Sequence, residues 1–301
     1  MAGARGTRAS WPAEMGIGCR LNAGQTSGAG PGAGSGGRPL AMIARAALLA
    51  AAVLIGAGWI LLLTTWPGRQ RARRGSWAVH HVSRLLLAAL RVRLAQQGGP
   101  RSGSSLVVAN HVSWLDVFVL AAAGPMIPVV QTEIARRPVI GLLCRRSGVL
   151  LLQRDRRREL PAGVDEIASA LRRGLRVQVF PEATTPCGSA PNPFRRATFQ
   201  AAIDAAVVVS PVAVAYLDVR ARPAPAAHFV EDTSLFRSVL RILRAGPMTA
   251  DVRWLPVIPA TVAGGHPAAD RARTAAAAER AIARTLRLAD AVVQPPTLRV
   301  A

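Results

Sequence analysis

A histidine and an aspartate five residues apart are the clearest candidates for chemistry in this chain. His111 and Asp116 belong to the stretch Asn-His-Val-Ser-Trp-Leu-Asp, which begins at Asn110 directly after the apolar run Leu106–Ala109. On one continuous helix, five residues rotate by about 500°, which would leave the two side chains roughly 140° apart. If a strand ends near Ala109 and a helix starts after His111, the turn can instead bring the imidazole onto the carboxylate.

Such a pair has a defined chemical use. A carboxylate that binds one imidazole nitrogen fixes the tautomer and leaves the other nitrogen free to take a proton. The pair is then a general base with its orienting partner, and a hydroxyl of the substrate can be the nucleophile. By itself the spacing is a weak signal, because a lone histidine beside an apolar strand is more often structural.

A second candidate carboxylate follows about 70 residues further along the chain. The alternating, β-branched run Gly174–Val179 predicts a strand that leads directly into Phe180, Pro181 and Glu182. Proline removes a donor from the strand ladder and ends the strand. Glu182 is therefore expected at the carboxyl end of a buried strand, where open α/β sheets build their sites. A turn with a solvated glutamate is the alternative.

Together these segments resemble the lysophospholipid acyltransferase family, typified by 1-acyl-glycerol-3-phosphate acyltransferase. That family carries Asn-His-x-x-x-x-Asp, a proline- and glycine-bearing block that ends in arginine, Phe-Pro-Glu-Gly-Thr, and a late Val-x-Pro-Val. The resemblance covers roughly residues 106–216, with the four blocks in the family's order and at its usual spacing. In this chain the blocks are Asn110–Asp116; Gln131, Pro138, Gly141, Gly148 and Arg154; Phe180–Thr185; and Val209–Val212.

Two departures from the family pattern concern the acceptor. The second block usually opens with lysine, where this chain has Gln131. The third block usually continues Gly-Thr-Arg, where this chain has Ala183, Thr184 and Thr185. In the family the missing arginine commonly helps to hold the acceptor's phosphate. The altered block resembles a bacterial branch with Phe-Pro-Glu-Ala-Thr-Thr, and some members of the broader branch use acceptors such as lyso-ornithine lipid.

The resemblance implies transfer of a fatty acyl group from acyl-CoA or acyl-carrier protein to the free hydroxyl of a lysophospholipid. The first expected acceptor is 1-acyl-glycerol-3-phosphate, which would give phosphatidate. His111 would remove the hydroxyl proton and Asp116 would orient His111. Backbone N–H groups at the start of the following helix are expected to stabilise the oxyanion. The residues expected to bind substrate are Asn110, Arg154, Phe180, Pro181, Glu182, Thr184 and Arg195.

Two alternatives to this function stay open. One is the same chemistry on another acceptor, such as lyso-ornithine lipid. The other is a catalytically silent membrane protein that only binds lipid. Arg154 and Arg195 suit an anionic head group, because a guanidinium fork matches phosphate, although a solvated basic loop is the alternative for Arg195. No metal and no cofactor beyond the acyl co-substrate is implied.

The charge of the chain points to anionic partners. Its 301 residues carry a formal net charge of +22, and all 38 basic residues are arginines. This balance implies either nucleic acid or anionic membrane lipid with a phosphorylated co-substrate. Nucleic acid is not expected, because the chain has no aromatic platform, zinc-knuckle spacing or helix-turn-helix signature. The three cysteines are far apart and fit neither a disulfide framework nor a metal site.

The N-terminal third predicts a membrane anchor. Residues 1–38 are rich in Gly, Ser and Arg and are expected to be disordered. Residues 39–68 contain an uncharged run of 21 residues, from 46 to 66, which is long enough to cross a bilayer as one helix. Arginines directly after this run favour a single pass through the inner membrane with the C-terminal side cytoplasmic. A buried core helix, a re-entrant hairpin or a cleaved signal peptide are the alternatives.

The remaining chain predicts an α/β domain. Residues 69–98 indicate a basic amphipathic helix on the membrane surface, or else the first helix of the globular domain. Residues 99–262 are expected to form the acyltransferase domain, a mixed sheet flanked by helices. Proline 256 places a predicted strand over 252–257 at the sheet edge. Residues 263–301 form an Ala/Arg-rich tail that is expected to be helical. Strands are expected at 106–109, 127–131, 149–153, 175–180 and 208–216, and helices at 77–94, 114–123, 138–147, 161–173, 198–206 and 235–243.

Overall fold

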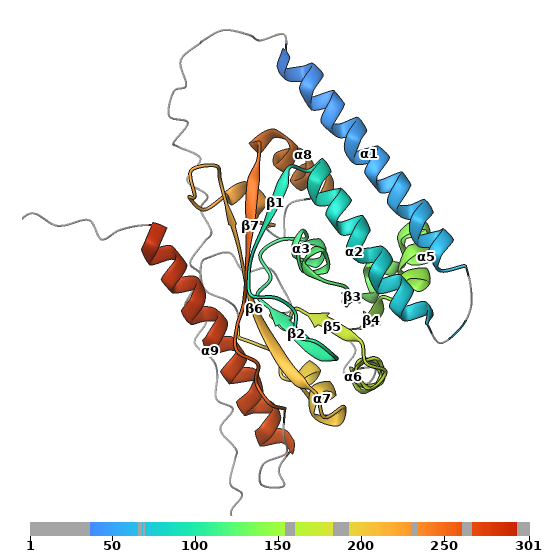
Figure 1. Cartoon of the computed structure of the whole chain (residues 1–301), viewed down its shortest axis with the longest axis vertical. Coiled ribbons are helices and arrows are strands. Elements are labelled where there is room, and N and C mark those ends of the chain that lie inside the picture. The colour runs from blue at the N-terminus through green and yellow to red at the C-terminus, as the bar shows by residue number, and fades with distance from the viewer. Residues whose placement is uncertain are drawn as a thin grey trace, which may run out of the picture. The chain divides into compact units, whose positions relative to one another are not determined.

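The computed structural model describes residues 37–65, 68, 70–153, 160–182, 193–229, 234–260 and 267–293. Within this part of the chain, seven strands form one sheet with helices on both faces (Figure 1). The N-terminal segment that was expected to be disordered lies almost entirely outside the described residues. Two of the three cysteines, Cys19 and Cys187, lie outside them as well.

The sheet is mixed, as the sequence predicts. Its strand order is β1-β7-β6-β2-β5-β3-β4, and every neighbouring pair is parallel except β6 with β7. Strands separated by helices in the chain produce this largely parallel arrangement. The strands are β1 Val92–Gln97, β2 Ser105–Ala109, β3 Ile127–Gln131, β4 Leu150–Leu152, β5 Arg176–Val179, β6 Val208–Leu217 and β7 Met248–Trp254.

Helices cover both faces of the sheet. Helices α2 and α3 lie on one face, and α7 and α9 lie on the other (Figure 1). The described helices are α1 Gly37–Leu63, α2 Arg71–Ala89, α3 Asp116–Ala123, α4 Thr132–Ala135, α5 Pro138–Ser147, α6 Leu160–Arg172, α7 Ala197–Asp204, α8 Leu235–Ala245 and α9 Pro267–Val293, with the 3₁₀ turn η1 Pro225–Ala227.

The central strand β2 shows why this sheet has two cores. Leu106 and Val108 pack into a cluster with α6, α7 and α9, whereas Val107 and Ala109 pack into a cluster with α2, α3 and α8. All four side chains are fully buried. Successive side chains of a strand point to opposite faces, so a strand covered on both sides is apolar throughout. The strand is buried up to its last residue, Ala109, which directly precedes Asn110 and His111.

The start of the domain differs from the expectation. The helix expected over 77–94 ends at Ala89, and Val92–Gln97 forms β1, which pairs in parallel with β7. The sheet therefore begins before residue 99, and α2 is the first helix packed on it. His80 of α2 is buried, and its Nδ1 lies 2.8 Å from the carbonyl oxygen of Ala121 in α3. The buried face of α2 therefore packs inside the domain.

The position of β7 also differs from the expectation. Pro256 favours an edge strand, yet β7 ends at Trp254 and lies between β1 and β6. Proline follows the strand and removes no ladder donor from it. The edge position belongs to β1, which was not predicted as a strand.

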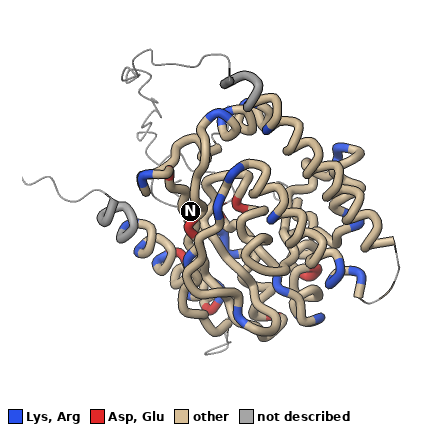
Figure 2. The backbone as a smooth tube through the Cα atoms, turned by 45° about the horizontal axis from the view of Figure 1, so that its top comes forward, with Lys and Arg blue, Asp and Glu red and all other residues tan. Residues whose placement is uncertain are grey.

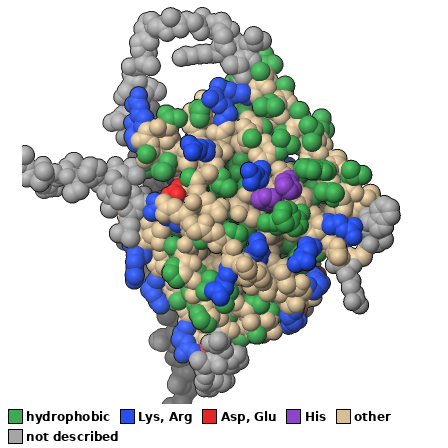
Figure 3. Space-filling model, in the orientation of Figure 1, with side chains coloured by type: hydrophobic (Ala, Val, Ile, Leu, Met, Phe, Trp, Pro, Cys, Tyr) green, Lys and Arg blue, Asp and Glu red, His purple; other side chains and the backbone are tan. Residues whose placement is uncertain are grey.

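Helix α1 fits the expected transmembrane helix. Among the described residues, Met42–Leu63 is the one stretch that is long and apolar enough to cross a membrane. Large apolar side chains along it are exposed, and Figure 3 shows hydrophobic side chains gathered along the edge where α1 lies. The exposed members on α1 are Ile43, Leu48, Val53, Leu54, Ile55, Trp59 and Leu62.

A close approach between α2 and α5 yields a stability prediction. A Cβ atom at Gly75 would lie 2.1 Å from the carbonyl oxygen of Ser147, so Gly75→Ala must push the two helices apart. We expect the variant to lower the free energy of unfolding by about 1–3 kcal/mol, because overpacking outweighs alanine's helix propensity. Gly58→Ala in α1 is the control, because a Cβ there meets nothing within 4 Å. Denaturant unfolding in detergent measures both, and a Gly75→Ala variant as stable as wild type would contradict the predicted clash.

Candidate active site

The site lies at the carboxyl ends of two neighbouring parallel strands. Strands β2 and β5 pair in register, with Val108 opposite Val179. The residues that follow each strand therefore come together at one edge of the sheet, as open α/β sheets generally arrange their sites. His111 follows β2 and Glu182 follows β5, although the two residues are 71 positions apart in the chain.

The turn after β2 brings His111 onto Asp116, as expected for a strand that ends near Ala109. Nδ1 of His111 lies 3.0 Å from Oδ2 of Asp116, the first residue of α3. The His111 side chain is 20% exposed, whereas the Asp116 side chain is fully buried. In the described part of the chain, no group bonds Nε2 of His111. The carboxylate thus fixes the tautomer that leaves Nε2 as the proton acceptor.

Asp116 is held by four donors in all. Its Oδ2 also accepts hydrogen bonds of 2.8 Å from the backbone N–H groups of Val112 and Ser113. Its Oδ1 accepts a hydrogen bond of 2.7 Å from the hydroxyl of Tyr216 on β6. A buried carboxylate needs such compensation for its lost hydration. The carboxylate is therefore rigid and can orient the imidazole without moving.

Tyr216 is a site residue that the sequence did not reveal. It lies 100 positions after Asp116, and no motif marks it. Strand β6 extends beyond the end of β2, and this extension brings Tyr216 to Asp116. Burial raises the pKa of the Tyr216 hydroxyl well above its usual value, and the negative charge of Asp116 raises that pKa further. Tyr216 is therefore a permanent hydrogen-bond donor at physiological pH.

Loss of this hydroxyl gives a second stability prediction. Tyr216→Phe leaves Asp116 with one donor fewer, and we expect the free energy of unfolding to fall by about 1.5–3 kcal/mol. Folding raises the pKa of the Tyr216 hydroxyl above its value of about 10 in the unfolded chain. The stabilisation by this hydroxyl is therefore fully present at pH values below the unfolded pKa, and it is lost as the pH rises through the folded pKa. Unfolding of wild type and Tyr216→Phe at pH 6, 8 and 11 tests this, with a constant difference expected at the two lower values. A difference that already shrinks between pH 6 and 8 would contradict it.

Glu182 and Phe180 both support His111. Oε1 of Glu182 accepts a hydrogen bond of 3.0 Å from the backbone N–H of His111, and Glu182 is buried. The ring of Phe180 stacks on the imidazole with 4.3 Å between the ring centroids. Both residues are predicted to bind substrate, whereas these two contacts are with His111 itself. Their binding role stays a prediction.

Asn110 braces the turn from the other side. Its Nδ2 donates to the carbonyl oxygen of Val214 at 2.9 Å, and its Oδ1 accepts from the N–H of Val214 at 2.8 Å. The side chain thereby continues the pairing of β2 with β6 after the strand itself has ended. The nitrogen and the oxygen of the Asn110 side-chain amide are both hydrogen-bonded in this way. Its predicted contact with substrate stays a prediction.

Several N–H groups at the start of α3, where oxyanion donors are expected, are occupied. The N–H groups of Val112 and Ser113 bind Asp116, and the N–H of Leu115 binds the hydroxyl of Ser113 at 3.2 Å. The turn uses these donors to fix the carboxylate. Oxyanion stabilisation by these N–H groups is therefore not supported by the geometry.

A small cleft lies beside Phe180 and Arg195. The cleft has a volume of about 50 Å³, and its lining includes Phe180, Pro181 and Arg195. The backbone N–H of Arg195 donates to the carbonyl oxygen of Pro181 at 2.9 Å, which ties the exposed arginine to the end of β5. The other predicted binding residues, Arg154 and Thr184, lie outside the described residues.

A second histidine, His228, lies beside the turn that carries His111. The N–H of Phe229 donates to the carbonyl oxygen of Val112 at 2.9 Å, which places His228 next to the loop that carries His111. Partial desolvation lowers the pKa of His228; the charge of Asp116 opposes this shift and that of Arg241 reinforces it. His228 is exposed, and the described residues give it no carboxylate partner comparable to that of His111. No group of three His, Cys, Asp or Glu side chains in the described ranges can hold a metal ion.

Comparison with known proteins supports the family. The family model described as "Acyltransferase" matches residues 91–215, a range that begins just before β1. A lyso-ornithine lipid O-acyltransferase of Pseudomonas aeruginosa is 30% identical over 252 residues, which are 81% of this chain and 92% of that protein. A 1-acyl-sn-glycerol-3-phosphate acyltransferase of Neisseria meningitidis is 39% identical over 144 residues, which are 47% of this chain and 56% of that protein.

The matches to the 1-acyl-sn-glycerol-3-phosphate acyltransferases of Neisseria are shorter than the match to the Pseudomonas protein. The chain spans about half the length of the relatives from Neisseria, with 56% for N. meningitidis and 44% for N. gonorrhoeae. The crystal structure of a 1-acyl-sn-glycerophosphate acyltransferase from Thermotoga maritima matches with a TM-score of 0.59 at 16% identity, over 83% of this chain and 95% of that one. The structural match concerns the fold alone. The near-complete match to the Pseudomonas protein and the matched family model show that this chain belongs to the lysophospholipid acyltransferase family of O-acyltransferases.

Proposed function

We propose that this protein transfers a fatty acyl group from a thioester donor to the free hydroxyl of a membrane lysophospholipid. The observation that carries the proposal is the bond between His111 and the buried Asp116, with Nε2 of His111 left available. His111 takes the proton from the acceptor hydroxyl as the oxygen attacks the thioester carbonyl. Asp116 stabilises the imidazolium that forms, and the thiol leaves as the tetrahedral intermediate collapses.

The acyl donor is acyl-CoA or acyl-carrier protein. Both are acidic, and the net charge of +22 favours their approach. Basic positions are spread over the helices and loops, with few acidic ones between them (Figure 2). Arg195 lines the cleft beside Phe180, and we propose that it binds an anionic head group. Arg154 is proposed for the same role from its place in the family pattern.

The first proposed acceptor is 1-acyl-glycerol-3-phosphate, and the product is phosphatidate. Relatives with that acceptor in their name include the one at 39% identity. Lyso-ornithine lipid is a second candidate, because the relative that covers 81% of this chain carries that name. The Thr184-Thr185 sequence, in place of Thr-Arg, favours the second acceptor as well.

An acceptor panel tests the proposal. Membrane vesicles with the full chain receive labelled acyl-CoA and either lysophosphatidate or lyso-ornithine lipid. Transfer to lysophosphatidate supports phosphatidate synthesis, whereas transfer to lyso-ornithine lipid alone makes the altered third block a change of specificity. If neither acyl-CoA nor acyl-carrier protein supports transfer to either lipid, the proposal is wrong and a silent lipid-binding protein becomes the better account.

We further propose that α1 holds the protein at the cytoplasmic face of the inner membrane. The exposed apolar side chains of α1 support this location. A chain that starts at Gln70 retains α2 and β1, and we expect it to move from the membrane pellet to the supernatant. Sedimentation after ultracentrifugation measures the shift. A truncated chain that still pellets completely, without aggregating, would place the anchor on another surface.

A further inference from the structure

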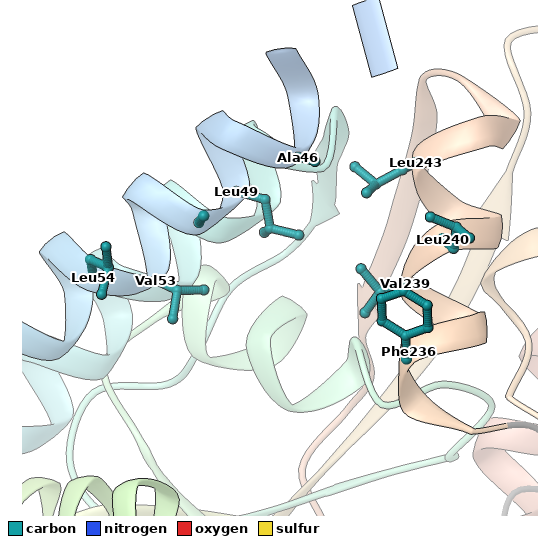
Figure 4. Close-up of a pocket in the computed structure, with 9 residues that line it drawn as sticks. Ala46, Leu49, Val53, Leu54, Phe236, Val239, Leu240 and Leu243 are labelled. Atoms are coloured by element: carbon teal, nitrogen blue, oxygen red, sulfur yellow. The ribbon is translucent and has the colours of Figure 1, made fainter. Parts of the chain in front are cut away.

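A larger, apolar hollow is lined by none of the residues of the turn that carries His111. Helices α1 and α8 line an open groove with a volume of about 460 Å³. Figure 4 shows side chains of the two helices facing each other across it. Every lining residue is apolar: Ala46, Leu49, Ala50, Val53 and Leu54 from α1, and Phe236, Val239, Leu240 and Leu243 from α8.

The sequence of α8 divides its surface into three faces. Phe236, Val239, Leu240 and Leu243 recur at the spacing of one helical face and point to the groove. Ser238 and Ile242 are buried toward the domain. The remaining face carries arginines. Ser238, Ile242, Leu243 and Arg241 bind the helix to the domain. Phe236 on the apolar face and Arg237 and Arg244 on the basic face remain exposed.

The arginine face forms a hollow that adjoins the groove. Arg237, Arg241 and Arg244 line a surface depression of about 610 Å³, which shares Leu240 with the groove. Arg241 donates to the carbonyl oxygens of Ala226 and His228, which fixes one guanidinium in place. Within the described ranges, the side chains of Arg237 and Arg244 have no hydrogen-bond or ion-pair partner, and no described acidic residue lines the hollow.

The groove also continues the membrane-facing surface of α1. Val53 and Leu54 line it and are at the same time among the exposed large apolar side chains of α1. Arg45 closes one end, since its Nη1 donates to the carbonyl oxygen of Leu243 at 3.1 Å. An apolar groove on a membrane helix, with unpaired arginines beside it, matches an amphiphile with an acyl chain and an anionic head group.

We infer that this paired surface is a binding site for an anionic phospholipid of the bilayer, separate from the catalytic acceptor site. One acyl chain lies in the groove between α1 and α8, and the phosphate lies against Arg237 and Arg244. The site is linked to the catalytic turn, because Nε1 of Trp114 donates to the hydroxyl of Ser238 at 3.0 Å. Leu49, Val239 and Trp114 also pack against one apolar cluster. The bound lipid therefore contacts the same helices that support the turn with His111.

Photocrosslinking in lipid nanodiscs tests the site without any need for acyl transfer. The full chain is reconstituted with phosphatidylglycerol or phosphatidylcholine that carries a diazirine in one acyl chain, and labelled peptides are mapped by mass spectrometry. We expect labelling on both α1 and α8, stronger for phosphatidylglycerol by about five-fold or more. Arg237→Gln with Arg244→Gln should remove that preference, whereas the control pair Arg172→Gln with Arg220→Gln should keep it.

Filling the groove provides the second arm. Ala50→Trp places an indole in the groove at an exposed helix position and should remove most labelling of α8. Ala51→Trp, exposed on the same helix but outside the lining, is the matched control. Equal labelling by the two lipids, or labelling that Ala50→Trp leaves unchanged, would mean general membrane contact only and would overturn the inference. Two further results would also overturn the inference. If lysophosphatidate displaces the labelled phospholipid at concentrations that saturate acyl transfer, the groove is a subsite for the acceptor. If α8 crosslinks to α8 of a second copy, the groove is a dimer contact.

Discussion

Replacing His111 by alanine is expected to lower acyl transfer by about 10²–10⁴-fold, the usual contribution of a positioned general base. Among the described residues, His111 is the one histidine whose ring bonds a carboxylate. The side chain is partly exposed, so its removal leaves no closed cavity in the core. We expect the variant to lose turnover but to keep its membrane association. Transfer of labelled acyl groups to lysophosphatidate measures the turnover, and sedimentation with membranes measures the association.

His228→Ala is the matched control for this variant. His228 lies beside the same turn and is exposed, but no carboxylate orients it in the described structure. It should keep most of the wild-type turnover. Near wild-type turnover in His111→Ala, or a loss in His228→Ala as large as in His111→Ala, would contradict the assignment of the base.

The second large effect is expected for Asp116→Asn, which should reduce turnover by about 10²–10⁴-fold with little loss of stability. The amide oxygen can keep the three bonds from His111, Val112 and Ser113. The hydroxyl of Tyr216 can rotate to accept a bond from the amide nitrogen. The fold therefore persists, while the negative charge that stabilises the imidazolium of His111 is lost.

Both quantities are needed to interpret Asp116→Asn. Turnover and the denaturant midpoint are measured on the same preparations, with Asp204→Asn on the exposed surface of α7 as control. A large fall in turnover with a midpoint close to wild type is the expected result. Unchanged turnover would show that the charge of Asp116 is not used, and a collapsed midpoint would show that the carboxylate is primarily structural.

Local patterns predicted much of the sheet and half of the site. The strand at 127–131 and the helix at 138–147 have the observed bounds, because each is a short apolar segment delimited by clear end signals. His111 meets Asp116 as expected, because a strand ends before His111 and a helix begins at Asp116. Glu182 follows a strand as expected, but its bond to the backbone of His111 was not predicted. The family pattern added the functional meaning of that arrangement.

The remaining features depend on contacts between distant segments. Tyr216 reaches Asp116 because β6 is longer than its neighbour β2. The sequence of either strand alone does not predict which strands pair. Residues 92–94 continue the apolar and arginine spacing of the preceding predicted helix, so the pairing of 92–97 with β7 was not apparent before the sheet was known. The apolar face of α8 is visible in sequence, but its partner, α1, lies almost 200 positions away.

The most direct test of the account is release of CoA from labelled acyl-CoA by the full chain in vesicles, measured with and without lysolipid acceptor. If His111 activates the acceptor hydroxyl, release requires the acceptor, equals the acyl-lipid formed, and is lost in His111→Ala. Release of one equivalent of CoA without acceptor, with the acyl group retained on the protein, would instead show an acyl-enzyme and contradict direct transfer. Release that continues unchanged in His111→Ala would contradict the central role of the His111–Asp116 pair.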